Sequence, residues 1–279
     1  MSAVALRVDT HAHVVDPARF PYAEGRGYRP RAHETGDATA YLATLAAGGV
    51  SHGVLVQPSC YGFDNRAMLD AIARGGGRLR GIAVVPTDVP QAELAALRGA
   101  GIVGVRLNLQ AFEPGFFARP EAPRFLARMR DEGMFVQVNA AGAAWPAIAP
   151  ILVASRARLL VDHLGQPDAA GGLDQPGFAA VLSLARETDA VVKLCGAFRL
   201  SRGGAPFADA RPFVARAIAA YGVDRCLWGS DWPFLDVERR PRYADLLAAL
   251  DSWLPSDADR ARVLWDNPAR LFGFAAALI

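Results

Sequence analysis

Two histidines, His11 and His13, lie two positions apart in the apolar run VDTHAHVVDP near the N-terminus. Residues i and i+2 of a β-strand point to the same face, so this spacing predicts two imidazole rings side by side. Such a pair can bind a metal ion, polarise a substrate carbonyl group, or pack with its nitrogens bonded to the backbone. Which of these applies depends on the polar residues that the fold brings beside the pair.

An aspartate in the sequence GSDWP and a third histidine are the residues that we expect beside this pair. Asp231 directly follows a short apolar segment, and His163 ends another. Serine and aspartate in such places commonly cap helices or form turns. A carboxylate beside histidines can instead remove a proton from water, if its pKa is tuned toward neutrality. We therefore predict a catalytic group with Asp231 as its general base: His11, His13, His163 and Asp231.

Short β-branched runs alternate with amphipathic segments rich in Ala, Leu and Arg, which predicts a parallel sheet covered by helices. Eight such units predict an α/β fold of the closed (β/α)8 type, a TIM barrel, in a single domain of residues 1–279. The expected strands are Leu6–His13, Gly53–Pro58, Leu79–Val85, Ile102–Leu109, Met134–Asn139, Leu159–His163, Ala190–Cys195 and Arg225–Gly229. The expected helices are Asp37–Ala47, Asn65–Ala73, Gln91–Gly99, Arg124–Glu132, Gly177–Glu187, Phe207–Tyr221, Arg242–Leu250 and Asp257–Val263.

Polar residues gather at the C-terminal ends of these expected strands, where barrel enzymes place their active sites. They include Arg106 and Asn139 besides the catalytic group. Asp162 and His163 are neighbours, and neighbours in a strand point to opposite faces. We therefore assign only His163 to the site and expect Asp162 to have a supporting role. The segment Phe20–Arg31 is expected to form a loop over the barrel mouth.

Composition and charge exclude several classes of protein. Apolar residues make up 52% and charged residues 21% of the 279 residues, which is typical of a packed globular chain. A net charge of +2 without a block of basic residues argues against nucleic acid as a partner. No apolar run approaches the ~20 residues that cross a bilayer, and no signal peptide is recognisable, so no membrane partner is expected. The three cysteines do not make a disulfide framework, so we expect a cytoplasmic protein. A homo-oligomer is compatible with the sequence.

Several stretches of the chain resemble the amidohydrolase superfamily, of the amidohydrolase-2 type. They are VDTHAHV, VQPSCYGFDNRAML, GVRLN, VDHLGQPD, VKLCGAFRLS, LWGSDWP and DNPARLFGF, and they run in order from Val8 to Phe274. The branch that they resemble most contains 2-pyrone-4,6-dicarboxylate lactonase and related sugar-acid lactone hydrolases. The resemblance implies a barrel that opens a lactone ring. Together with the rim positions, it predicts these substrate-binding residues: Ser59, Tyr61, Arg106, Asn139, Gln166, Arg199 and Asp236.

Three positions depart from the pattern of the pyrone lactonase. Phe112 stands where that enzyme has an arginine, Gln166 replaces the arginine of its GRPD sequence, and Asp236 replaces an asparagine. The site has thus lost two positive charges and gained a negative one. Arginine binds carboxylates through paired hydrogen bonds, so a dicarboxylate should be bound less well here. We expect a lactone with a single carboxylate, or a neutral hydroxylated lactone.

The metal ligands of the superfamily are only partly present. By resemblance, metal-dependent members have a bridging lysine on the fourth strand, a histidine on the fifth and a histidine on the sixth. In this chain the fourth strand ends with Arg106 and Asn108 and the fifth with Asn139, and only His163 on the sixth is retained. The pyrone lactonase branch is similar in lacking these ligands, and its members work without a metal. No cofactor is therefore expected to be required. A single Zn²⁺ could still bind three imidazoles and one carboxylate, which suit zinc: His11, His13, His163 and Asp231.

The expected function is the opening of a small, carboxylated lactone by water at the barrel mouth. Asp231 would take a proton from water, the three histidines would stabilise the oxyanion, and Arg106 and Arg199 would hold a carboxylate. Two alternatives remain open. One is a Zn²⁺-dependent decarboxylase or hydrolase of the same superfamily, which metal analysis would distinguish. The other is a non-catalytic barrel that binds a sugar acid, which turnover of any lactone would exclude.

Overall fold

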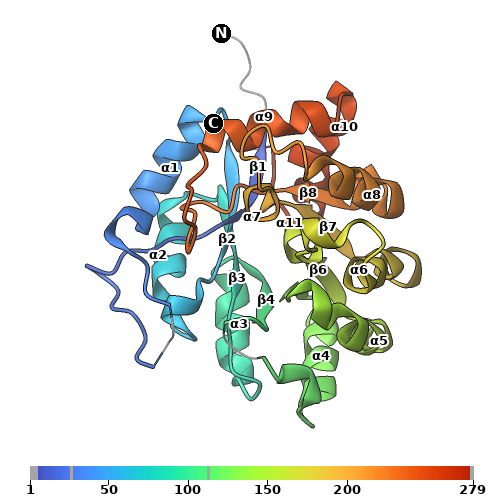
Figure 1. Cartoon of the computed structure of the whole chain (residues 1–279). Coiled ribbons are helices and arrows are strands. Elements are labelled where there is room, and N and C mark those ends of the chain that lie inside the picture. Colours follow the sequence, from blue (N-terminus) through green and yellow to red (C-terminus); the bar gives the residue numbers. More distant parts are fainter. Residues whose placement is uncertain (1–5, 26–27, 112–113, 277–279) are drawn as a thin grey trace.

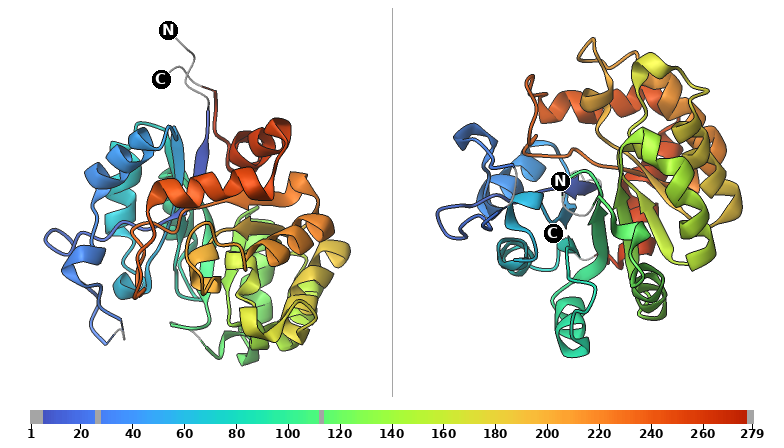
Figure 2. Two further views of the ribbon diagram at one scale, coloured as in Figure 1. Left: turned by 45° about the horizontal axis from the view of Figure 1, so that its top comes forward. Right: turned by 60° about the horizontal axis from the view of Figure 1, so that its bottom comes forward.

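The structure, a computed structural model, describes residues 6–25, 28–111 and 114–276 of the chain. Eight parallel strands follow one another in chain order, and helices surround them (Figure 1). The first and last strands meet at a bridge between Ala12 and Trp232, where the amide of His13 donates to the carbonyl of Trp232 at 2.7 Å. The last helices, in orange and red, complete the ring beside the first helix, in blue (Figure 2). The predicted TIM barrel is confirmed.

All the predicted strands are present, with ends that differ by a few residues from the prediction. They are β1 (Val8–Ala12), β2 (His52–Val56), β3 (Leu79–Ala83), β4 (Ile102–Asn108), β5 (Phe135–Asn139), β6 (Arg158–Val161), β7 (Val191–Leu194) and β8 (Cys226–Trp228). The α-helices are α1 (Ala38–Ala47), α2 (Arg66–Arg74), α3 (Gln91–Gly99), α4 (Ala122–Asp131), α5 (Trp145–Ser155), α6 (Pro176–Glu187), α7 (Ala197–Leu200), α8 (Arg211–Tyr221), α9 (Tyr243–Trp253), α10 (Asp257–Ala261) and α11 (Asn267–Phe272). A π-helical segment, Arg262–Asp266, joins the last two.

Two of the helix predictions need correction. The helix expected from Phe207 begins only at Arg211, because Phe207 has a left-handed backbone with φ 58° that an α-helix cannot include. The helix expected over Asp257–Val263 ends at Ala261, where the π-helical turn begins. Among the described residues, no helix is both long enough and apolar enough to cross a bilayer.

Helix α5 was not predicted from the sequence. Its residues, WPAIAPILVAS, are almost all apolar, so they lack the polar stripe that marks a surface helix. Pro146 lies in the first turn, where its missing N–H has no role, but Pro150 lies inside, where proline normally breaks a helix. Burial of Ile148 and Leu152 stabilises the helix instead.

The barrel interior changes from apolar to polar along the strands. In β7, Val191 is followed two positions later by Lys193, and Leu160 of β6 is followed two positions later by Asp162, directly after the strand. Val191 and Leu160 pack in an apolar cluster that includes Phe272 from the end of the chain. Side chains two positions apart share a face, so the polar residues lie above this cluster, toward the C-terminal ends of the strands.

Gly229, the residue after β8, allows the last strand to lie against the first. A Cβ atom at Gly229 would lie 2.6 Å from the Cβ of His11 and 2.8 Å from its backbone nitrogen. Asp231 follows with φ 63°, and its amide donates to the carbonyl of His11 at 2.7 Å. Only glycine leaves space for this approach, because the contact is with backbone atoms that cannot rotate away.

Gly229→Ala should therefore lower the free energy of unfolding by about 1–3 kcal/mol, the usual cost of overpacking a buried position. Gly99→Ala is the control, since a Cβ atom there meets nothing within 4 Å. The control should keep or slightly raise the stability, because alanine restricts the unfolded chain. Urea unfolding followed by circular dichroism measures both. Equal stabilities would mean that the junction between β1 and β8 adapts to a side chain.

Candidate active site

The predicted catalytic residues lie together at the C-terminal mouth of the barrel. His11 belongs to β1, His13 follows it, and His163 and Asp231 follow β6 and β8. The ring centres of His11 and His13 are 5.1 Å apart, and those of His11 and His163 are 4.7 Å apart. Asp231 Oδ1 lies 3.2 Å from His13 Nε2 and 3.7 Å from His11 Nε2. All four residues are buried, so their charges are little screened by water.

The contact between His13 and Asp231 requires a cation. His13 Nδ1 lies 2.7 Å from the carbonyl oxygen of Val56, which can only accept, so Nδ1 carries a hydrogen. His13 Nε2 faces the carboxylate oxygen of Asp231 at 3.2 Å, and an ionised carboxylate also only accepts. A neutral imidazole with its hydrogen on Nδ1 has none left for this second contact. The pair is therefore arranged to hold either one additional proton or a metal ion.

His11 presents an unpaired nitrogen to this pair. Its Nδ1 lies 3.3 Å from Asp162 Oδ1, so the ring hydrogen is most stable on that nitrogen. Burial holds the pKa of His11 well below its ordinary value, against the attraction of Asp162, and the ring is neutral. His11 Nε2 then carries a lone pair, is buried, and has no hydrogen-bond partner in the described structure.

Asp162 also points into the barrel, which corrects the expectation that only His163 does. Strand β6 ends at Val161, and His163 has φ 50° and ψ 44°. The alternation of a strand no longer applies after that point, so the two neighbouring side chains both face the interior. Asp162 is fully buried and His163 is 7% exposed.

Asp162 is the centre of a buried group of charged and polar residues. Its carboxylate lies 3.3 Å from Arg106 Nε and 3.8 Å from Lys193 Nζ, and it accepts a hydrogen bond from Gln137 Nε2 at 3.0 Å. Burial alone would raise the pKa of Asp162, but His11, Lys193 and Arg106 outweigh it and hold this pKa well below its usual value. The carboxylate is therefore ionised, and it orients His11.

Cys195 fixes the tautomer of His163. Burial raises the pKa of the Cys195 thiol well above its ordinary value and lowers the pKa of His163 to about 4, so both groups are neutral. The Cys195 Sγ atom lies 3.1 Å from His163 Nδ1. A thiol donates to the lone pair of an imidazole, which leaves the ring hydrogen on Nε2. His163 can then offer an N–H donor to a ligand.

Arg199 forms an ion pair with the predicted base. Its Nε donates to Asp231 Oδ2 at 2.6 Å, and its Nη2 donates to the carbonyl of Leu235 at 2.9 Å. Burial acts to raise the pKa of Asp231, but Arg199 and then His163 outweigh it and hold this pKa well below its usual value. The expectation of a pKa tuned toward neutrality is thus not met in the free protein.

A hollow of about 170 Å³ opens beside these residues at the barrel mouth. The predicted site residues that line it are His13, Ser59, Arg106, Asn139, His163, Gln166, Arg199, Asp231 and Asp236. Residues not assigned to the site from the sequence also line it: Tyr28, Pro58, Asn108, Gln110, Ala111 and Leu235. The loop Phe20–Arg31 was expected to cover the mouth and accounts for Tyr28. Gln110 and Leu235 have no signal of their own in the sequence.

Three residues singled out in the sequence do not line this hollow or cannot be placed. His11 lies behind it, against Asp162 and Asp231. Tyr61 is fully buried, and its hydroxyl accepts from the amide of Asp16 at 2.8 Å, so this placement gives no support to its predicted contact with substrate. Phe112 lies outside the described residues.

Two groups of side chains among the described residues have the donor atoms of a metal site: His11, His13 and Asp231, and His11, His163 and Cys195. The four predicted zinc ligands therefore do not form one group. In the first group, the Nδ1 atoms of His11 and His13 face oxygen acceptors, as the second ring nitrogen of a metal-bound histidine usually does. Their Nε2 atoms both face the carboxylate of Asp231. The unpaired Nε2 of His11 is the atom that a metal would satisfy. The first group fits one divalent ion.

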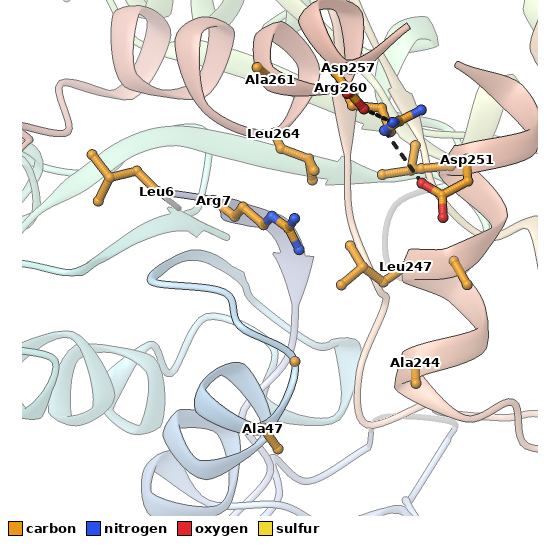
Figure 3. Close-up of a pocket in the computed structure, with 13 residues that line it drawn as sticks. Leu6, Arg7, Ala47, Ala244, Leu247, Asp251, Asp257, Arg260, Ala261 and Leu264 are labelled. Atoms are coloured by element: carbon orange, nitrogen blue, oxygen red, sulfur yellow. Dashed lines mark hydrogen bonds and ion pairs between the residues drawn. The ribbon is translucent and has the colours of Figure 1, made fainter. Parts of the chain in front are cut away.

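A second hollow, of about 540 Å³, lies beside the start of β1 between α1, α9 and α10 (Figure 3). Three of its charged residues pair with one another: Arg260 contacts Asp257, and the Nε atom of Arg260 lies 3.4 Å from Asp251 Oδ1. None of its 13 lining residues is a histidine or a cysteine. We therefore place the candidate active site at the barrel mouth.

The chain belongs to the Amidohydrolase family, whose profile matches residues 8–274. It is 36% identical over 273 residues to 4-sulfomuconolactone hydrolase of Rhizobium radiobacter, covering 95% of this chain and 89% of that protein. It is 32% identical over 276 residues to 2-pyrone-4,6-dicarboxylate hydrolase of Comamonas testosteroni, and the match covers 95% of this chain and 89% of that protein. It is 28% identical over 268 residues to D-galactarolactone isomerase of Agrobacterium fabrum, and the match covers 95% of this chain and 90% of that protein. The resemblance seen in the sequence is confirmed.

Solved structures agree with this assignment. The crystal structure of a probable 2-pyrone-4,6-dicarboxylic acid hydrolase from Acinetobacter baumannii, with citric acid bound, has a TM-score of 0.86 and 31% identity. The match covers 96% of this chain and 99% of that one. The relatives are thus named for lactone hydrolysis in most cases and for lactone isomerisation in one.

Lys193→Met should lower the free energy of unfolding by about 3–5 kcal/mol, because removing one partner of a buried ion pair leaves the other uncompensated. Lys193 Nζ lies 3.8 Å from Asp162 and donates to Gln137 Oε1 at 2.5 Å. The double variant Lys193→Met/Asp162→Asn should recover part of this loss, since it removes the buried negative charge as well. Urea unfolding of the three proteins measures both effects. A single variant that loses less than about 1 kcal/mol, the level of an exposed pair, would contradict this account.

Proposed function

We propose that this protein hydrolyses the ester bond of a small lactone at the mouth of its barrel. The observation that supports this best is the convergence of Asp231, His13 and His163 on a hollow that two arginines also line. A carboxylate beside oriented imidazoles provides a base and hydrogen-bond donors together, which is what acyl transfer to water needs. The lactone hydrolases among the relatives agree with this reaction class.

Asp231 is the base of this mechanism. It accepts a proton from a water molecule, whose oxygen attacks the lactone carbonyl carbon. In the free protein the Asp231 carboxylate is held by Arg199 at 2.6 Å. A substrate carboxylate that binds Arg199 would compete for this contact and leave Asp231 to orient the water. The charge on the substrate would thereby help to prepare the site.

His163 is the hydrogen-bond donor to the developing oxyanion, because Cys195 occupies its Nδ1 and leaves the ring hydrogen on Nε2. His13 is not a donor to the oxyanion, because its two nitrogens face the carbonyl of Val56 and the carboxylate of Asp231. Each donor of this kind contributes about 2.7–4 kcal/mol to a tetrahedral intermediate. The intermediate collapses by breaking the ring C–O bond, and the departing oxygen takes the proton from Asp231. His11 Nε2 carries a lone pair and has no hydrogen to donate, so His11 does not stabilise the oxyanion.

A divalent metal ion fits the same site. His11 Nε2, His13 Nε2 and the Asp231 carboxylate would hold it. When bound, such an ion supplies Lewis-acid chemistry toward a carbonyl oxygen and lowers the pKa of a water molecule. In the proposed mechanism, a proton between His13 and Asp231 takes the place of this ion.

Asp231→Asn should lower kcat by about 10²–10⁴-fold, the range of general-base catalysis, and should change the Kd of the ring-opened acid little. The variant keeps the shape of the side chain and removes the base. Asp251→Asn in the distant hollow is the matched control and should keep wild-type kcat. Lactone hydrolysis followed by acid release measures both. A kcat near the wild-type value in Asp231→Asn would remove Asp231 from this role.

Dialysis against a chelator should leave lactone hydrolysis unchanged, because the histidines and Asp231 supply the chemistry themselves. The measurement combines metal analysis of the purified protein with rates before and after chelation. Lost activity that Zn²⁺ restores would favour the Zn²⁺-dependent hydrolase or decarboxylase instead. Binding of a sugar acid without turnover of any lactone would favour the non-catalytic barrel.

A further inference from the structure

Four amide side chains form a continuous hydrogen-bonded chain along one wall of the active-site hollow. Gln110 Nε2 donates to Gln166 Oε1 at 2.5 Å, Gln166 Nε2 to Asn139 Oδ1 at 2.5 Å, and Asn139 Nδ2 to Asn108 Oδ1 at 2.9 Å. The register of β4 against β5 pairs Asn108 with Asn139 and so places these two side by side. We call these four residues the amide chain, and all of them line the hollow.

The backbone fixes the direction of the amide chain. Asn108 Oδ1 lies 3.3 Å from the amide nitrogens of both Gln110 and Ala111, which can only donate. If Asn108 were flipped, its own NH₂ group would face these N–H groups, so its oxygen must stay on this side. Asn139 then has to donate to Asn108, and Gln166 has to donate to Asn139. The order of donors and acceptors is thereby set as far as Gln110.

The amide chain leaves both donors and acceptors unused. Each amide nitrogen has two hydrogens, and at most one of them takes part in the chain. The NH₂ group of Asn108 makes no hydrogen bond within the described ranges, and Asn139 and Gln166 each keep one hydrogen. At the other end, Gln110 Oε1 keeps its lone pairs. A hydroxyl group both donates and accepts, so it matches this uncharged wall, whereas a carboxylate only accepts.

The charged groups of the hollow favour the same kind of ligand. Arg106 is paired with Asp162, and Arg199 is paired with Asp231. The side chain of Asp236 makes no hydrogen bond or ion pair in the part of the chain that the structure describes. A second carboxylate on a ligand would therefore find both lining arginines already paired and an uncompensated anion nearby. A hydroxyl group could instead donate its hydrogen to Asp236.

We infer that the amide chain and Asp236 form a subsite for hydroxyl groups, and that the preferred substrate is a polyhydroxylated lactone with at most one carboxylate. This inference rests on the proposed lactone hydrolysis and names its substrate class. Gln166 is the specificity-determining residue, because it joins the two ends of the amide chain. Asn108 and Gln110, which the sequence alone did not assign to the site, complete the subsite.

The test compares D-glucono-1,5-lactone with δ-valerolactone, which has the same ring size and no hydroxyl groups. The ratio of their kcat/KM values reports the subsite. Gln166→Met keeps the length of the side chain and removes its hydrogen bonds, and it should lower this ratio about tenfold, the cost of leaving buried polar groups unpaired. Gln91→Met makes the same chemical change on the exposed side of α3 and should keep the ratio. Gln166→Arg should lower the ratio and raise activity toward 2-pyrone-4,6-dicarboxylate.

An equal ratio in Gln166→Met and Gln91→Met would overturn the inference. So would a wild-type protein that hydrolyses 2-pyrone-4,6-dicarboxylate better than D-glucono-1,5-lactone. If the wild-type protein hydrolyses none of the three lactones, the proposed function fails. Calorimetric titration of the Asp231→Asn variant with the two uncharged lactones then tests whether the subsite exists. Tighter binding of D-glucono-1,5-lactone than of δ-valerolactone would support the subsite, and equal binding would overturn it.

Discussion

The contact of Asp231 with the first strand is the constraint on which the site depends. Its backbone amide donates to the carbonyl of His11 at 2.7 Å, and its carboxylate lies 3.2 Å from His13 Nε2. The residue whose backbone helps to close the barrel is therefore also the proposed base. Gly229 makes the approach sterically feasible, because any Cβ atom there would collide with His11. A change that loosens the junction must also displace the base from its imidazoles.

Below this junction, buried charges determine which nitrogen of each ring is free. Asp162 is kept ionised by Lys193 and Arg106, and it holds the hydrogen of His11 on the side away from Asp231. Cys195 has the corresponding effect on His163 with a neutral group. Buried ion pairs seldom add net stability, because desolvation offsets their attraction. Here the arrangement defines the proton positions of the site, which apolar residues of similar volume could not do.

Much of the fold could be read from the sequence, because short β-branched runs and amphipathic segments alternate along the chain. The pair His11 and His13 follows from strand periodicity, and Asp231 follows from its place after the last strand. Helix α5 was not predicted, because its sequence is apolar on all sides and contains Pro150 in its interior. That His163 faces the interior together with its neighbour Asp162 depends on the left-handed backbone of His163, which is not a glycine and which no local pattern indicates. The amide chain depends on the register of β4 and β5 and on two loops, so it is visible only in three dimensions.

The position of Gln166 has a consequence for how this protein could evolve. Gln166 has φ 51° in the loop after β6, a conformation that costs glutamine and arginine alike. It lies at the edge of the hollow, apart from the strands that orient the base and the imidazoles. Glutamine and arginine codons differ by a single nucleotide, so one mutation can exchange a neutral side chain for a cationic one without disturbing the barrel. Under the proposed function, this one step would change the charge of the wall that faces the ligand and would leave Asp231 and His163 unchanged.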